Sequence, residues 1–441
     1  MEFIPQIFFV IVFATANYYI FKSVKRIRQN ILLGKDIDLS GNFSERIKKM
    51  ALVALGQKKM FKKPVPAILH LFIYLGFLIV NLEILEISID GLFGSHRVFA
   101  KPLGSFYAPF INVFEFFAVS VIAACAVFLI RRNILHVKRF TGIEMTKKPK
   151  LDANIILITE IFLMIAFLTM NASDSILQSR AIGHYIPTGD FFFSGVFKGL
   201  LIHVSNAGLM IIERFCWWFH IIGVFCFANY VFWDSKHLHI FLAFPNTYFS
   251  KLEPAGQFTN MAEVTKEVKL MLNLPVENPD ANPVAGKFGA KDVTDLTWKN
   301  LMESYSCTEC GRCTQQCPAN ITGKKLSPRK IMMDTRDRLE EVGRGIEKNG
   351  KEFNDGKSLL GDYITDEEIL ACTTCNACVE ACPVNINPVD IIMQLRRFKI
   401  MEESQMPQSW QMMFSNVENN FAPWKFPSSD RFKWADQLNQ E

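Results

Sequence analysis

Eight of the eleven cysteines fall into two runs of identical spacing, CTECGRCTQQCP at residues 307–318 and CTTCNACVEACP at residues 372–383. Each run reads Cys-x2-Cys-x2-Cys-x3-Cys-Pro. Three thiolates at this spacing can wrap one corner of an iron–sulfur cubane on a tight turn. The fourth follows on a helix that points away, so it commonly binds the other cluster. The two runs therefore predict two [4Fe-4S] clusters.

Each predicted cluster takes three ligands from one run and its fourth from the other. We expect one cluster to be bound by Cys307, Cys310, Cys313 and Cys382, and the second by Cys372, Cys375, Cys378 and Cys317. The competing interpretation is a zinc ribbon, but its signature is two cysteine pairs separated by a spacer. The other three cysteines lie in apolar runs and are expected to be small core residues: Cys125, Cys216 and Cys226.

The segment between the two runs predicts helices. It contains LSPRKIMMDTRDRLEEV, with Pro328 suited to a helix start, and ITDEEILACTT, in which Thr365 precedes an acidic first turn. Residues 296–405 are therefore expected to form an α-helical two-cluster ferredoxin domain. Two clusters in series would let electrons cover a long distance in short steps.

The first half of the chain predicts a membrane domain, residues 1–243. A helix rising ~1.5 Å per residue needs roughly 20 apolar residues to cross the hydrocarbon. Five runs approach this length: residues 3–21, 66–88, 111–130, 154–170 and 211–234. The fourth is the shortest. The expected fold is thus mainly α, with a five-helix transmembrane bundle followed by the ferredoxin domain.

Loop charge predicts the orientation of this bundle. Residues 22–65 contain 12 Lys and Arg and residues 131–153 contain 7, whereas residues 89–110 and 171–210 contain 2 each. By the positive-inside rule the N-terminus faces out and everything after residue 235 is cytoplasmic. That compartment is reducing, which favours metal ligation over disulfides. Neither half has a Lys/Arg stripe with interleaved aromatics, so nucleic-acid binding is excluded.

Histidines in the first half supply candidate haem ligands. His70 lies about four residues into the second apolar run, and His237 and His239 lie just past the end of the fifth. These two helices run in opposite directions, so the sites share one depth, and facing imidazoles are the axial ligands of a b-type haem. We expect His70 and His239 to bind one haem. His220 lies 19 residues before His239, about 28 Å of helix rise away, where a second haem would bind.

Ionisable residues within apolar spans are costly and often functional. Glu83 and Glu86 lie one turn apart in the second run, Glu115 lies in the third and Glu160 in the fourth. For Glu83 and Glu86, proton exchange with a quinone and a plain interfacial position both stay open. Four cations are expected at the cytoplasmic face, either to pair with haem propionates or only to orient the bundle in the membrane: Lys63, Arg131, Arg132 and Lys236. Three further histidines are expected to be interfacial: His96, His136 and His184.

Two stretches resemble known families. The five spans, together with HIIGVFCFANYVFWDSKHLHIFLAFP, are similar to the cytochrome b (gamma) subunit of respiratory nitrate reductase, in which an S-x-x-x-H motif, here Ser235 to His239, ends the helix. MESYSCTECGRCTQQCPANITGKKLSP resembles the iron–sulfur subunit of heterodisulfide reductases and of anaerobic glycerol-3-phosphate dehydrogenase. The fusion of both is similar to membrane-bound iron–sulfur oxidoreductases that link electron transfer flavoprotein to menaquinone.

The resemblance implies an electron-transfer subunit in the cytoplasmic membrane of a bacterium or archaeon. It would pass electrons between a cytoplasmic partner and menaquinone, its substrate, through the two clusters and one b-type haem, or two, without catalytic side chains of its own. The implied partner is electron transfer flavoprotein, a dehydrogenase, or a separate iron–sulfur subunit with CCG motifs. A redox sensor or scaffold, and an electron wire whose quinone site lies on another subunit, are the alternatives.

The sequence departs from these families in three ways. Val80 stands where the nitrate reductase subunit has a second His in its second span, so a second haem lacks its expected ligand. The paired His of that family's fifth span are 18 residues apart, whereas His220 here lies 17 residues from His237 and 19 from His239. His203 is a candidate substitute ligand. There is no CCG motif. Residues 244–295 are expected to be a linker. Residues 406–441, with Trp410, Trp424 and Trp434, are expected to be a docking tail or to pack back on the ferredoxin domain.

Overall fold

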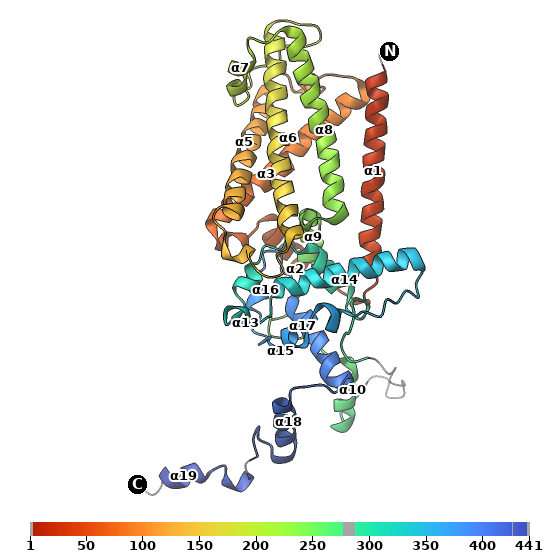
Figure 1. The fold of residues 1–441 in the computed structure, drawn as a ribbon, viewed down its shortest axis with the longest axis vertical. Helices are drawn as coiled ribbons and strands as arrows, with labels where there is room; N and C mark the ends of the chain where they lie inside the picture. The colour runs from red at the N-terminus through yellow and green to blue at the C-terminus, as the bar shows by residue number, and fades with distance from the viewer. Residues whose placement is uncertain (1–2, 277–286, 426, 439–441) are drawn as a thin grey trace.

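The computed structural model of the chain describes residues 3–276, 287–425 and 427–438. It is 70% helical, with no β-strand among these residues, which confirms the mainly α expectation. Figure 1 shows a bundle of long helices from the N-terminal half, with the cysteine-bearing half lying across one end of it. We call this end the iron–sulfur side and the opposite end the far side.

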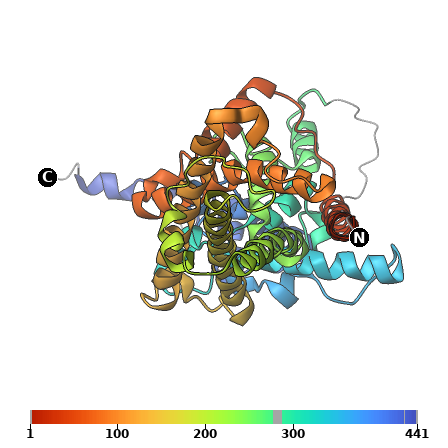
Figure 2. The ribbon, with the colours of Figure 1, turned by 90° about the horizontal axis from the view of Figure 1, so that it is seen from above.

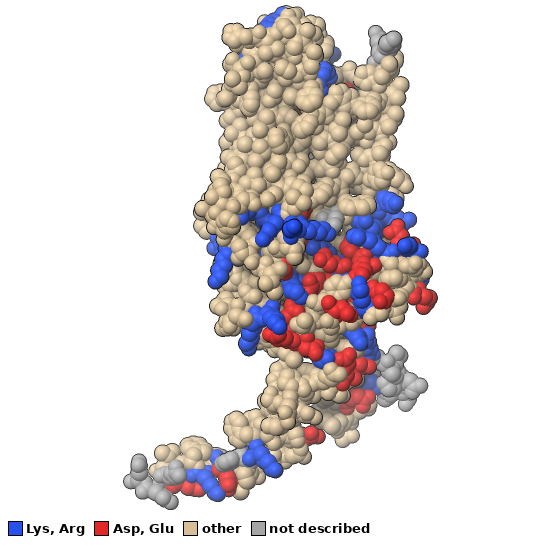
Figure 3. All heavy atoms as spheres, in the orientation of Figure 1, with Lys and Arg blue, Asp and Glu red and all other residues tan. Residues whose placement is uncertain are grey.

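Five helices are long and apolar enough to cross a membrane. They are α1 (Ile4–Ile31), α3 (Pro64–Phe93), α5 (Tyr107–Asn133), α6 (Lys147–Ser179) and α8 (Asn206–Asp234). Helix α6 packs against α5 and α8, α3 packs on α5, and α1 lies against α3 and α8. Figure 2, which views the bundle end-on, shows α1 at its edge. Charged side chains are sparse along the visible side of the bundle and gather where it meets the iron–sulfur body, as expected of a membrane domain (Figure 3).

All five spans are longer than their apolar runs, and two of them show why. The shortest run lies in the longest of the five helices, α6, whose far-side turns carry the buried polar residues Asn171, Asp174 and Gln178. Polar side chains that are hydrogen-bonded inside a bundle lower the hydropathy of a helix without ending it. Helix α3 likewise continues to Phe93, so Glu83 lies inside the helix and not at its end.

A break in the backbone separates the last span from the following helix. Ser235 is extended, with φ −118° and ψ 142°, and its hydroxyl accepts a hydrogen bond from the His237 amide (3.2 Å). A 3-10 turn, Lys236–Leu238, then leads into α9 (His239–Tyr248). The remaining short helices of the first half are α2 (Phe43–Met50), α4 (Ala100–Leu103) and α7 (Gly195–Leu201). The break turns the 237–239 segment away from the axis of α8.

The iron–sulfur body is a set of short helices around one long one. Its helices are α11 (Trp298–Ser306), α12 (Arg312–Gln315), α13 (Pro318–Ile321), α14 (Pro328–Asn349), α15 (Asp366–Leu370), α16 (Ala377–Ala381) and α17 (Pro388–Arg397). The Ser327 side chain caps α14, and Thr365 forms a capping box with Glu368 at the start of α15. Both helices predicted between the cysteine runs are therefore confirmed, and their apolar faces enclose a core that includes Leu301, Ile331 and Leu395.

The first span reaches beyond the bundle and contacts the iron–sulfur body. On α1, Asn30 donates to the Tyr305 hydroxyl (2.9 Å), and its side chain lies so close to Gly343 of α14 that a β-carbon there would come within 2.1 Å of it. Residues 32–63 also lie on this body, where the Lys35 amide donates to the Leu296 carbonyl (2.7 Å). The two halves are thus joined by side-chain contacts as well as by the chain.

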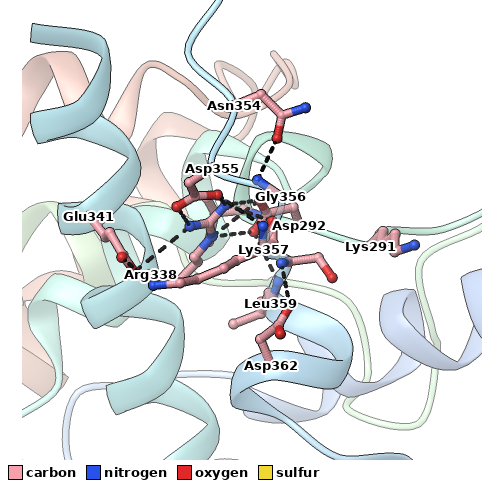
Figure 4. Close-up of polar contacts among 12 residues, drawn as sticks. Lys291, Asp292, Arg338, Glu341, Asn354, Asp355, Gly356, Lys357, Leu359 and Asp362 are labelled. Atoms are coloured by element: carbon pink, nitrogen blue, oxygen red, sulfur yellow. Dashed lines mark hydrogen bonds and ion pairs between the residues drawn. The ribbon is translucent and has the colours of Figure 1, made fainter. Parts of the chain in front are cut away.

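A buried arginine connects three segments of the iron–sulfur body (Figure 4). The Arg338 guanidinium on α14 is 3% exposed and pairs with Asp292 (2.8 Å) and Asp355 (2.6 Å). It also donates to the Lys357 carbonyl oxygen (2.8 Å). Arg338 therefore holds the segment around Asp292, which leads into α11, and the loop around Asp355 and Lys357, which follows α14, against the same helix.

The segments at the edges of the domains are less buried. Within residues 244–295, the expected linker, lies α10 (Ala262–Met271), while residues 277–286 are outside the described part of the chain. The tail carries α18 (Gln408–Asn420) and α19 (Lys433–Leu438) and extends away from the body in Figure 1. No residue of α18 is buried, and Trp424 and Trp434 are 66% and 62% exposed. Trp410, by contrast, is half-buried.

Candidate cofactor relay

The two cysteine runs adopt the same unusual turn. Glu309 and Thr374 occupy the same position of each run and have φ of 54° and 56°. Gly311 and Asn376 follow with φ of 70° and 58°. Glycine and asparagine tolerate this left-handed conformation best. A turn of this shape lets the first three thiols of each run surround one point, as a cubane corner requires.

Thiols of the two runs lie near one another, and Cys313 is near both Cys382 and Cys378, so the crossed ligand sets stay a prediction. Cys382 interacts electrostatically with Cys310 and Cys313 of the first run. Cys317 interacts in the same way with Cys372 and Cys378 of the second. We call the first group the proximal cluster site and the second the distal cluster site.

Burial governs the chemistry of these thiols. It raises the pKa of Cys307 to about 12 and that of Cys382 to about 11. Such thiols are protonated and unreactive unless a metal displaces the proton. Among the described residues, no group of three or more His, Cys, Asp or Glu side chains is arranged to bind a single metal ion.

Two histidines meet at the iron–sulfur side of the bundle. The ring centres of His70 on α3 and His239 on α9 lie 6.4 Å apart. Metal–imidazole bonds of about 2.0–2.1 Å would place two ligand rings on either side of one iron at roughly this separation. His70 Nδ1 lies 3.2 Å from Gln57 Oε1, and His239 Nδ1 lies 3.1 Å from the Lys236 carbonyl oxygen. Each ring thereby keeps Nε2 free, as a haem ligand must.

The third histidine of this group lies beside the pair. His237 is 5.4 Å from His239 between ring centres, and its Nδ1 has no hydrogen-bond partner in the described part of the chain. Burial, the first cause, lowers the pKa of both side chains below the ordinary value, so both are neutral at physiological pH. Neutral imidazole is the form that binds a metal.

One cavity of about 390 Å³ joins the histidines to the proximal cluster site. Its wall includes all three histidines of this group, and also Cys307, Cys310, Cys313 and Cys382. Of the cysteines of the distal site, only Cys378 belongs to this wall, while Cys375 is exposed at the protein surface. The proximal site therefore faces the bundle and the distal site faces solvent.

The cavity wall is strongly basic near the cysteines. Arg131, Arg132, Arg139 and Lys236 line it. All but Arg139 were among the four cations expected at this face, and the fourth, Lys63, instead donates to Gln315 (2.6 Å). Lys236 pairs with Asp152 (3.5 Å) and Glu309 (3.2 Å). The free arginines suit the carboxylates of a haem.

Sequence reasoning missed Gln57, Lys59 and Arg329. Gln57 is buried with φ 49°, a conformation that nothing in the sequence indicates. Lys59, from the same loop, donates to the Val379 carbonyl (3.0 Å) beside Cys378. Arg329 pairs with Glu144 (2.7 Å), which belongs to the basic loop of residues 131–153. Burial raises the pKa of Glu144, but the Arg329 guanidinium outweighs burial and holds this pKa below the ordinary value. These loops therefore hold the bundle against the proximal site.

The second haem position has one histidine. His220 is fully buried and lines the deep end of the cavity, where its Nδ1 lies 2.9 Å from the Leu163 carbonyl oxygen. Its Nε2 has no hydrogen-bond partner among the described residues. His203, the candidate substitute ligand, is exposed and does not line the cavity. Of the cysteines expected in the core, Cys125 and Cys216 are buried, but Cys226 is exposed because it lies on the outer face of α8.

The carboxylates of the spans divide into two groups. Glu160 lines the cavity. Glu86 and Glu115 instead belong to a hydrogen-bonded cluster at the far side: Tyr107 donates to Glu86 (2.9 Å) and Asn171 to Glu115 (3.0 Å), and Arg97 donates to both Tyr107 and Asn171. Glu83 is buried nearby but does not line the cavity. Glu83 and Glu86 are both buried inside the bundle.

Comparison with known proteins identifies the iron–sulfur body. Residues 306–386 match the family of 4Fe-4S dicluster domains. The chain is 29% identical to a probable iron–sulfur-binding oxidoreductase, FadF, of Bacillus subtilis, and 26% identical to the EtfAB:quinone oxidoreductase of Syntrophomonas wolfei. Both alignments cover 97% of this chain, and they cover 60% and 59% of those relatives. This chain thus spans about three-fifths of the length of the relatives it matches.

A third relative matches a shorter part of the chain. A probable membrane-anchored ferredoxin of Chromohalobacter salexigens is 30% identical over 36% of this chain and 26% of its own length. No solved structure matches the chain. The relatives are named as iron–sulfur oxidoreductases or as a ferredoxin, and residues 306–386 of this chain have the 4Fe-4S dicluster domain.

Proposed function

We propose that the chain is a membrane-anchored subunit that passes electrons between a cytoplasmic redox partner and menaquinone through two [4Fe-4S] clusters and a b-type haem. The observation that carries the proposal is the shared cavity: His70, His239 and the proximal cysteines line one space. A haem there would supply a one-electron carrier next to the proximal cluster. The cofactors would carry the redox chemistry, and the protein would hold them at short distances from one another.

Each residue has a defined part in this proposal. His70 and His239 would hold the haem, because both present a free Nε2 and their rings lie 6.4 Å apart. Gln57 and the Lys236 carbonyl orient them by accepting from Nδ1. The crossed cysteine sets bind the proximal and distal clusters, the distal one lying nearer solvent and hence nearer the partner.

The partner and the orientation follow from the relatives and the charges. One relative is named for EtfAB and quinone, and this chain aligns with only 59% of it. We infer that electron transfer flavoprotein, a dehydrogenase or a separate CCG-containing subunit docks at the distal cluster and the exposed tail. The basic loops lie at the iron–sulfur side, which supports our proposal that this side faces the cytoplasm of a bacterium or archaeon.

Ligand substitutions test the haem site. We expect His70→Ala and His239→Ala to lose the haem while keeping the full iron–sulfur content, measured as haem and non-haem iron per purified chain. His237→Ala is the matched control from the same segment and should retain haem. Retention of haem by both ligand variants would contradict the site. Loss of haem by His237→Ala alone would move the ligand two residues along the chain.

A further inference from the structure

The cavity that holds the histidine pair extends deeper into the bundle than one haem site needs. On α3 its wall runs from His70 to Ile84, and Asn81 lies about 16 Å of helix rise beyond His70. The deep walls are largely apolar, formed by Phe77, Ile84, Leu157, Met164, Val224 and Phe227. An apolar cavity with a few polar groups is the usual form of a small-molecule site.

Several polar atoms in this deep end lack hydrogen-bond partners among the described residues. The Tyr74 hydroxyl and His220 Nε2 are buried without a hydrogen-bond partner among the residues that the structure describes. Glu160 lines the same space and makes no hydrogen bond or ion pair with any described residue. Burying unsatisfied polar groups in a bundle is costly, so their grouping in one cavity indicates a ligand that satisfies them.

We propose that the deep end of the cavity is the head-group site of the quinone, an inference that rests on the proposed function. His220 and Glu160 come from α8 and α6, and Tyr74 and Asn81 come from α3, which forms another wall. An aromatic ring with two opposed oxygens can therefore be hydrogen-bonded from both walls. The apolar residues cover its faces and its isoprenoid chain.

The hydrogen bond at His220 fixes its role. Because a carbonyl oxygen can only accept, Nδ1 carries the proton that is donated to Leu163, and the neutral ring leaves Nε2 as an acceptor. Nε2 can therefore accept a hydrogen bond, and then a proton, from a quinol hydroxyl. Glu160 is the second proton carrier at this wall.

The chemistry at this site balances as a two-electron, two-proton exchange. Oxidation of a quinol breaks two O–H bonds, its protons pass through Glu160 and His220 to water, and its two electrons leave one at a time toward the cluster sites. Reduction runs in the opposite direction, with electrons from the cytoplasmic partner and protons from water. The deep end lies close enough to His70 for direct electron exchange, because Tyr74 is one helical turn away.

A quinone fits this position better than a second haem. The other histidines of the cavity wall are His70, His237 and His239, all at the iron–sulfur end, so the described wall offers no second imidazole facing His220. Asn81 is exposed on the outside of the bundle and also lines the cavity, so the cavity opens toward the lipid at this level. A quinone diffuses in the bilayer and would enter there.

The test uses the full chain in detergent with menadiol as electron donor and menadione as ligand. Glu160→Gln and His220→Phe should lower the rate of menadiol-driven haem reduction by about tenfold or more, because each removes a proton acceptor. Menadione affinity measured by titration calorimetry should fall about fivefold to tenfold. Haem content and reduction by dithionite should stay as in the unaltered chain. Glu83→Gln, a buried carboxylate of the bundle outside the cavity wall, is the matched control and should change neither quantity.

Four outcomes would overturn the inference. Unchanged rates and affinities in both variants would place the quinone site elsewhere while leaving the proposed function intact. A decrease confined to Glu83→Gln would assign the site to the far-side carboxylates. A lower haem content in His220→Phe would make His220 a haem ligand. If menadiol failed to reduce even the unaltered chain, the quinone part of the proposed function would fail together with the site.

Discussion

The fourth cysteine of each run decides how the two cluster sites are connected. Cys317 and Cys382 each follow a short helix that leads out of their own turn, and each interacts with thiols of the other run. In the proposed crossed arrangement the two sites share a framework, and neither can form without residues from both runs. This exchange also keeps the proximal and distal sites close together.

Cysteine substitutions test the crossed ligand sets. Cys382→Ser and Cys310→Ser should each remove the same cluster, leaving about half of the iron and one electron paramagnetic resonance signal. Cys317→Ser and Cys375→Ser should remove the other cluster and leave the other signal. Cys216→Ser, at a buried cysteine of the bundle, is the control and should keep both signals. Matching signals in Cys310→Ser and Cys317→Ser would contradict the crossed assignment.

The sequence predicts most of the site at the residue scale. Cysteine spacing defines the two cluster groups, and the matched depths of His70 and His239 predict that they meet, which the structure shows. Gln57 could not be predicted, because its role depends on a left-handed backbone in a loop. The side of α8 on which Cys226 lies could not be predicted either, since an apolar run does not distinguish lipid-facing from buried positions.

At the scale of helices, the contact between α1 and α14 joins the two halves. Gly343 allows the approach, since a β-carbon at this position would clash with the Asn30 side chain. Asn30 in turn donates to Tyr305. Any larger residue must push the helices apart or displace this hydrogen bond.

We expect Gly343→Ala to destabilise the protein by about 1–3 kcal/mol, the usual cost of overpacking. The measurement is the free energy of unfolding in denaturant, followed by loss of cluster absorbance. Gly199→Ala is the matched control, because Gly199 is also helical but has open space around it. That change should be neutral or slightly stabilising. Equal effects of the two substitutions would contradict the close contact.

The second prediction at the scale of helices concerns Arg338. Arg338→Ala leaves Asp292 and Asp355 without their shared cation, and breaking a buried pair costs about 3–5 kcal/mol. The same denaturation experiment should show that loss. Lys357→Ala is the control: it removes the partly exposed pair with Glu341, worth about 0–1 kcal/mol. A loss below that of the control would show that the cluster in Figure 4 is not structural.

Helix starts are predictable from capping residues, whereas helix lengths in the bundle are not. Ser327 and Thr365 indicate the starts of α14 and α15 correctly. The far-side end of α6, residues 171–179, is not predicted because Asn171 and Asp174 make it look polar. Their partner, Arg97, comes from a different loop, so only the tertiary structure reveals why these residues are buried.

At the scale of the whole molecule, the cluster sites, the histidine pair and the deep cavity follow one another in space from the solvent-exposed end into the bundle. The distal cluster site faces solvent, the proximal site faces the bundle, and the histidine pair and the deep cavity follow. Charge supports the same direction, with basic residues at the junction of the two bodies (Figure 3). The exposed tail extends from the end where the proposed partner would dock (Figure 1).

The sequence predicts the two bodies but not how they are joined. The five spans and the helical ferredoxin follow from hydropathy and cysteine spacing. That residues 32–63 and Glu144 contact the iron–sulfur body could not be predicted, because each contact joins residues far apart in the chain. These loops read only as basic, solvent-exposed connections.

The central claim, that a haem and the proximal cluster share one cavity, is tested most directly by the anaerobic optical spectrum of the purified chain, with haem and non-haem iron counted per polypeptide. The proposal predicts a reduced b-type spectrum with one haem for every two [4Fe-4S] clusters, together with the loss of haem in His70→Ala. Two haems would support a ligand role for His220 instead of the quinone site. A chain with both clusters and no haem would contradict the relay and leave a ferredoxin anchored to the membrane.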